Sequence, residues 1–196
     1  MCVQVGRPTD HLLVGAREGE GRGLAAEDAV REAEERLQRG IRMMADPMAA
    51  MGFLKQLAQA RCMAALHPCH RLSFELALAL VSSSAMVGAP AAAVRAEYSL
   101  KAIEAMEAVL VVGTPQLASL YASHSAALLQ LIRGRAEAAP PPMCEQCLAT
   151  LRAALAIRTV CFGEDDALAR STRRACESAR QAIRQATGLE LPDGGG

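Results

Sequence analysis

Helix-length apolar segments recur along this chain and are separated by short breaks rich in Gly and Pro. Leu54, Leu100 and Leu148 occupy equivalent places in three of these segments, and the second and third segments end at Gly113 and Gly163. The repeat is about 46 to 50 residues long, which fits a pair of helices with their connections. A lone helix pair cannot bury its own apolar faces. The pattern therefore predicts helix pairs that stack on one another.

The apolar residues are of the kinds that favour helices. The chain is 52% hydrophobic but only 3% aromatic, and it has no Trp. Cores built from Ala, Leu, Met and Val let helices approach closely, whereas strands favour aromatic and β-branched residues. The composition therefore predicts an all-α fold of stacked antiparallel helix pairs, with about seven helices.

Gly, Pro and capping residues mark where these helices begin and end. Asp46 before Pro47, and Thr114 before Pro115, place an N-cap in front of a proline at the first helical position. Asp165 or Asp166 is expected to cap the last helix. The expected helices cover approximately residues 25–44, 47–66, 69–87, 90–111, 115–133, 143–161 and 166–187.

Three regions are expected. Residues 1–23 lack a sustained apolar period and are predicted to form a flexible arm, and residues 189–196 a flexible tail. Residues 24–188 form the helical domain, with a stiff Pro-rich insert at 139–142. In the last helix Leu168, Ala175, Ala179 and Ile183 share one face and arginines crowd the rest, as expected of a terminal capping helix.

Charge, hydropathy and cysteine content indicate which partners and which cellular compartment to expect. The formal net charge is +0, which argues against a dedicated nucleic-acid surface. No apolar run approaches the roughly 20 residues that span a bilayer, and the start lacks a signal-peptide pattern. Seven scattered Cys do not form a disulfide framework and indicate a reducing compartment. We expect a cytoplasmic or nuclear protein that binds neither nucleic acid nor membrane.

The motif Cys144-Glu-Gln-Cys147 has the greatest chemical potential in the chain. Thiols three residues apart at a helix start lie on one side, and the helix N-terminus is expected to lower their pKa. Redox activity would need a thioredoxin-like setting, and zinc would need two further ligands. Ordinary packing of both thiols is the favoured interpretation, with a thiol or zinc role as the alternative.

Two histidine-containing groups are candidate sites. Cys62, His67, Cys69 and His70 cluster near a break, but their spacing matches no common zinc pattern. His124 is flanked by two serines, yet adjacent helical residues point apart, so a polar lining of a concave face is favoured over catalysis. We therefore predict no metal, no cofactor and no catalytic residue.

Several segments resemble a known repeat class. Runs 97–107, 114–121 and 147–158 are similar to tetratricopeptide-like repeats, whose helix pairs form a right-handed superhelix. With His67-Pro68 ahead of them, their order over residues 48–183 most resembles the C-terminal helical domain of SET-and-MYND lysine methyltransferases. In that family this domain helps wall the substrate cleft and can bind partner proteins. The family's catalytic and zinc regions lie upstream, and this chain has neither the Asn of the Asn-His motif nor a zinc-binding Cys array.

These features predict a protein-interaction module whose curved helix pairs offer a groove for a protein or peptide on their concave side. The alternative is a fragment or accessory part of a SET/MYND-type lysine methyltransferase. The candidate groove residues are polar and lie on helices expected to face the concave side: Arg71, Glu75, Gln116, Ser119, Ser123 and Gln130.

Overall fold

All regular structure in the described part of the chain is helical. The computed structural model describes residues 26–109, 113–135 and 139–188, in which eight α-helices and two 3-10 helices occur without a β-strand. The predicted all-α class is confirmed for these residues. The expected arm at 1–23 and tail at 189–196 lie outside them. Contacts between residues divide the chain into two compact units, Met1–Leu76 and Ala77–Gly196.

In the first unit, α1 (Ala26–Arg42) packs against α2 (Pro47–Ala58) and the single turn α3 (Arg61–Ala64). The 3-10 helix η1 (Met43–Ala45) follows α1 directly. Leu37 of α1 and Leu54 of α2 are fully buried. Asp46 caps α2 as predicted, because its carboxylate accepts a hydrogen bond from the Ala49 N–H at 3.1 Å.

The second predicted helix, at 47–66, is interrupted, and this expectation was wrong. The backbone at Ala60 is extended, with φ −74° and ψ 150°, and the helix resumes as α3. Neither Gly nor Pro stands at this break. The change of direction buries Cys62 and Met63 while α3 packs on α1. Tertiary packing therefore overrides a locally favourable helix.

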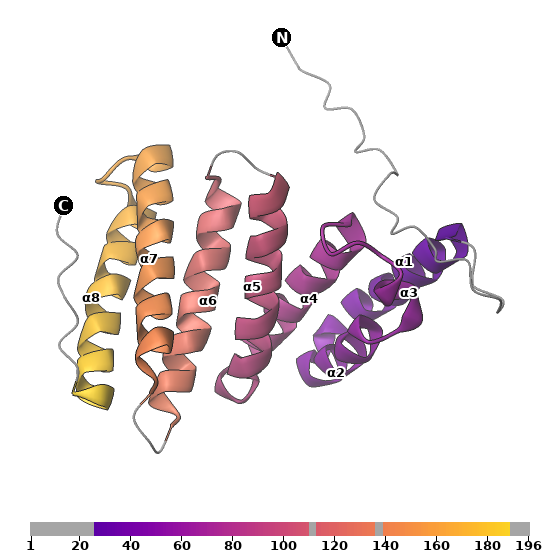
Figure 1. The fold of residues 1–196 in the computed structure, drawn as a ribbon, viewed down its shortest axis with the longest axis horizontal. Helices are drawn as coiled ribbons and strands as arrows, with labels where there is room; N and C mark the ends of the chain where they lie inside the picture. The colour runs from indigo at the N-terminus through magenta and orange to yellow at the C-terminus, as the bar shows by residue number, and fades with distance from the viewer. Residues whose placement is uncertain (1–25, 110–112, 136–138, 189–196) are drawn as a thin grey trace, which may run out of the picture. The chain divides into compact units, whose positions relative to one another are not determined.

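Helix α4 (Arg71–Val87) runs across the boundary between the units. The second unit continues with η2 (Ala89–Ala91), α5 (Ala92–Val109), α6 (Pro115–Arg133), α7 (Pro141–Phe162) and α8 (Ala167–Thr187). From α5 onward each helix packs against the next, and the four lie side by side in chain order (Figure 1). This serial arrangement matches the predicted stacking of helix pairs.

Local caps define these helices. Thr114 accepts a hydrogen bond from the Leu117 N–H at 3.2 Å, and Asp166 accepts one from the Leu168 N–H at 2.7 Å. Helix α7 begins at Pro141, so two of the three prolines expected in a separate insert lie in its first turn. Proline suits this position because the first helical N–H groups have no intrahelical acceptor.

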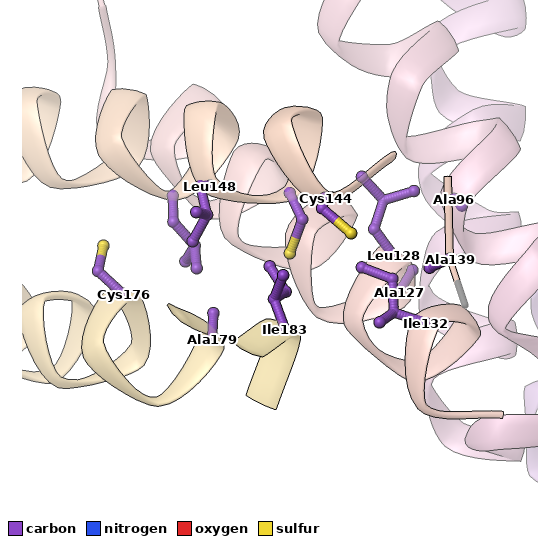
Figure 2. Close-up of a cluster of buried hydrophobic side chains, with 12 residues drawn as sticks. Ala96, Ala127, Leu128, Ile132, Ala139, Cys144, Leu148, Cys176, Ala179 and Ile183 are labelled. Atoms are coloured by element: carbon purple, nitrogen blue, oxygen red, sulfur yellow. The ribbon is translucent and has the colours of Figure 1, made fainter. Parts of the chain in front are cut away.

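The core that joins α6, α7 and α8 contains small and medium side chains (Figure 2). Leu128 and Ile132 come from α6, Cys144 and Leu148 from α7, and Ile183 from α8. Short side chains at this core allow helices to approach closely and hold their facing surfaces in fixed register. The core thereby positions the outer surface of the same three helices.

The face of α8 expected to be buried was predicted only in part. Ala179 and Ile183 are buried, but Leu168 is 50% exposed and Ala175 is also exposed. The buried stripe instead passes through residues rotated by one position, Ala169, Thr172 and Cys176. No described helix combines the length and apolar character needed to cross a bilayer.

Candidate functional site

A pocket of about 310 Å³ opens between α6, α7 and α8 in the second unit. This volume is at the lower end of the range for small-molecule sites and suits one or two side chains of a peptide. Its lining combines small, apolar, hydroxyl and guanidinium groups: Ala122, Ser125, Ala126, Leu129, Arg133, Leu151, Arg158, Ser171, Thr172, Ala175 and Ser178.

Small side chains at helical spacing create this hollow. Ala122 and Ala126 of α6 are four residues apart and share a face. Ser171, Ala175 and Ser178 form a similar stripe on α8. Since these side chains are too short to fill the space between the two helices, the pocket stays open.

Arg158 of α7 is held in place at the pocket. Its Nη1 donates a hydrogen bond to the Thr172 hydroxyl oxygen at 2.5 Å. That hydroxyl in turn donates to the carbonyl oxygen of Leu168 at 2.7 Å. The hydroxyl proton of Thr172 is thus engaged within α8, and its oxygen accepts from Arg158. The remaining guanidinium N–H groups of Arg158 make no hydrogen bond within the described residues.

Arg133 brings a second positive charge to the lining, from the last turn of α6. Its side chain is exposed and makes no ion pair within the described residues. No Asp or Glu among the described residues lines the pocket. Two formal positive charges therefore share a pocket lining that contains no carboxylate.

Ser125 connects the pocket to the core behind it. Its hydroxyl donates to the carbonyl oxygen of Cys147 at 2.8 Å and lies 3.2 Å from the Cys147 Sγ. Ser125 is only 1% exposed, so this bond ties α6 to α7 in a buried setting. It contributes to the rigidity of the pocket floor.

The Cys144-Cys147 pair is packed in the core, in line with the favoured interpretation. Both side chains are fully buried. Burial raises the pKa of the Cys144 thiol, and the charge of Glu145 adds to that shift. Burial also raises the pKa of the Cys147 thiol, while the hydrogen bond between this thiol and the Ser125 hydroxyl opposes part of that shift. The lowered pKa expected from the helix N-terminus was wrong, because desolvation disfavours the thiolate.

Four of the predicted groove residues lie on α6. Gln116 and Ser119 are exposed, and the Ser119 hydroxyl donates to the carbonyl oxygen of Pro115 at 3.0 Å. Ser123 is half-buried, and Gln130 accepts a hydrogen bond from Arg95 at 2.5 Å. None of the four lines the pocket. Contact of these side chains with a peptide stays a prediction.

The other two predicted groove residues, Arg71 and Glu75, belong to the first unit. Arg71 forms ion pairs with Glu75 at 2.8 Å and with Glu34 at 3.0 Å. These hydrogen bonds raise the pKa of Arg71. The positive charge of Arg71 is therefore already paired with two carboxylates within the first unit.

The three histidines in the described part of the chain make local or buried hydrogen bonds. His67 Nδ1 accepts a hydrogen bond from the Cys69 N–H at 3.1 Å, and His70 Nδ1 accepts one from the Leu72 N–H at 3.2 Å. Within the described residues, no three His, Cys, Asp or Glu side chains are grouped to hold a metal ion. His124 is 2% exposed and bonds to α5, so the expected lining of a concave face was wrong for this residue.

Sequence reasoning missed the arginines of the pocket. Arg133 and Arg158 are separated by 25 positions and lie on different helices, so no linear motif connects them. A usable signal was the stripe of small residues at 171, 175 and 178 on an otherwise arginine-rich helix. No protein-family model matches this chain, and no curated protein matches it in sequence.

Proposed function

We propose that this chain is a protein-interaction module that binds a peptide segment of its partner in the pocket between α6, α7 and α8. One observation carries this proposal: three successively packed helices leave a pocket of about 310 Å³ between small side chains. A peptide side chain that enters such a pocket buries apolar surface at Leu129 and Leu151 and meets hydrogen-bond donors around them.

The lining supports binding rather than covalent chemistry. It includes serine hydroxyls, but no His, Asp, Glu or Lys among the described residues lines the pocket as a base. The thiol of Cys147 lies beside Ser125, but burial raises its pKa and disfavours the thiolate. A serine needs such a base to become a nucleophile. His124 is directed towards α5 instead, with Nδ1 3.0 Å from the carbonyl oxygen of Ala96. The tetratricopeptide-like class, expected from the sequence, is part of the same proposal.

The test is selection of peptides by the intact chain from a random linear peptide library displayed on phage. Synthetic versions of the selected peptides are then titrated by fluorescence anisotropy. Ala126→Trp and Ala175→Trp would fill the pocket from two opposite walls, and both alanines are exposed enough to accept a larger side chain. Ala149→Trp, at an exposed position of α7 that does not line the pocket, is the matched control.

We expect Ala126→Trp and Ala175→Trp each to weaken peptide binding at least about tenfold, a loss of about 1.4 kcal/mol. Ala149→Trp should bind like the wild type. Thermal unfolding of each variant separates a blocked pocket from a misfolded chain. Failure to select any peptide, or unchanged binding by both pocket variants, would refute the proposal.

A further inference from the structure

The charge and donor content of the pocket define the kind of peptide side chain that it accepts. We propose that Arg133 and Arg158 hold the carboxylate of a Glu or Asp side chain from an acidic peptide segment. This inference rests on the proposed function and adds the chemical class of the ligand.

The first argument is electrostatic. The whole chain has a formal net charge of +0, yet the described residues that line the pocket include two arginines and no carboxylate. Helix α8, which forms one wall, has five arginines and one glutamate within Ala167–Thr187. At physiological ionic strength charges act over about 8 Å, so this excess raises the positive potential at the pocket itself.

The second argument is the supply of hydrogen-bond donors. A guanidinium has five N–H donors and no acceptor. Arg158 uses one of its donor groups on Thr172, and this bond fixes the guanidinium without supplying a counter-charge. Arg133 makes no hydrogen bond within the described residues, and the hydroxyls of Ser171 and Ser178 are additional donors. A ligand that only accepts hydrogen bonds therefore fits this lining best.

The third argument distinguishes an acidic peptide from other anions. Ala122, Ala126, Leu129, Leu151 and Ala175 supply apolar walls next to the charges. The methylene groups of a Glu or Asp side chain can pack on these walls, whereas an inorganic anion would leave them wet. In the part of the lining that the structure describes, no aromatic side chain is present for base stacking, so this lining does not suit single-stranded RNA. A lysine-containing peptide would meet like charges.

The test compares matched peptides in fluorescence anisotropy titrations of the intact chain. One set contains Glu or Asp at a central position of peptides selected by the chain, and a second set has Gln or Asn there. A third set has Lys there. Each acidic peptide is also made with an amidated C-terminus, which removes the terminal carboxylate and leaves the side chain in place. A labelled single-stranded oligouridylate is titrated in parallel.

We expect the acidic set to bind at least about tenfold more tightly than the amide set, with the lysine set weakest. Amidation of the C-terminus should leave this preference unchanged. Arg133→Gln and Arg158→Gln should each remove most of the preference, and Arg133→Glu should favour the lysine set. Arg173→Gln, which removes an exposed arginine of α8 outside the pocket lining, should change affinity less than about twofold.

The outcomes separate this inference from the proposed function. If peptides bind, Ala126→Trp blocks them, and the acidic and amide sets bind alike, the inference is refuted while the peptide-binding function stands. If no peptide binds, both are refuted. Loss of binding on amidation, or tighter binding of the oligouridylate than of any peptide, would also refute a side-chain carboxylate ligand. Arg133 is exposed and makes no ion pair in the described structure, so its variants remain informative if Arg158→Gln unfolds.

Discussion

The imidazole Nδ1 of His124 in α6 donates a hydrogen bond to the backbone carbonyl oxygen of Ala96 in α5, at 3.0 Å. A carbonyl oxygen only accepts, so the proton of the neutral ring is on Nδ1. The Nε2 atom then carries a lone pair, and it is buried without a hydrogen-bond partner in the described structure. Burial lowers the pKa of His124, while the Ala96 contact opposes part of that shift.

This arrangement predicts that acid weakens the fold through His124. Below pH 6.5, the ordinary value for histidine, the unfolded chain binds a proton there that the folded chain still excludes. Stability therefore falls as pH drops from about 7.5 to about 5, by at most about 1.4 kcal/mol per pH unit for one proton. Urea unfolding should show that the stability advantage of the wild type over His124→Gln shrinks across this range. A constant or growing advantage would contradict the assignment.

The buried guanidinium of Arg95 predicts an asymmetry between two substitutions. Its Nη2 donates to Gln130 Oε1 at 2.5 Å, and its Nε has no hydrogen-bond partner in the described residues. Burial lowers the pKa of Arg95. Gln130→Leu removes the acceptor and leaves the charge buried, which should cost about 1.5–3 kcal/mol. Arg95→Met removes the charge and keeps most of the apolar stem, so its cost should be smaller. Urea unfolding of both single variants and of the double variant measures the coupling free energy between Arg95 and Gln130. A larger loss of stability from Arg95→Met than from Gln130→Leu would contradict this prediction.

Two glycines of the first unit should respond to alanine with opposite signs. A Cβ at Gly40 would lie 2.4 Å from Leu54 Cδ2, whereas a Cβ at Gly52 would meet nothing within 4 Å. Gly40→Ala should therefore destabilise by about 1–3 kcal/mol, because the buried side chain of Leu54 or α2 itself must shift to make room. Gly52→Ala should stabilise by roughly 0.5–1 kcal/mol, because alanine favours a helix. Thermal unfolding of the two variants provides the comparison, and equal shifts would show that Gly40 is not a contact point.

The cysteines should react in an order set by burial. Cys161 is exposed, whereas Cys144 and Cys147 are buried and have a raised thiol pKa. Brief alkylation of the native protein at about pH 8, followed by peptide mass spectrometry, should label Cys161 before Cys144 and Cys147. In denaturant all three should be labelled at similar rates. Rapid labelling of Cys147 in the native protein would instead support a reactive thiol in the Cys144-Glu-Gln-Cys147 motif.

Residues that act within one turn of the chain could be predicted from the sequence. Asp46, Thr114 and Asp166 cap helices because each carries an oxygen within reach of an N–H two or three residues later. Gly163 and Gly188 end α7 and α8 with positive φ values of 92° and 67°, which glycine adopts without steric cost. The apolar period and the small-residue composition likewise indicated stacked helices.

Properties that depend on neighbouring helices were decided by the tertiary structure alone. The break before α3 has no local signal and follows from packing of Cys62 and Met63. Burial raises the pKa of Cys147, although its position near a helix start suggested the reverse. Arg133 and Arg158 line one pocket only because α6, α7 and α8 bring them together. A sequence specifies helix ends through short-range hydrogen bonds, but which side chains share a surface depends on the rotation and register of packed helices, which is set by the whole core.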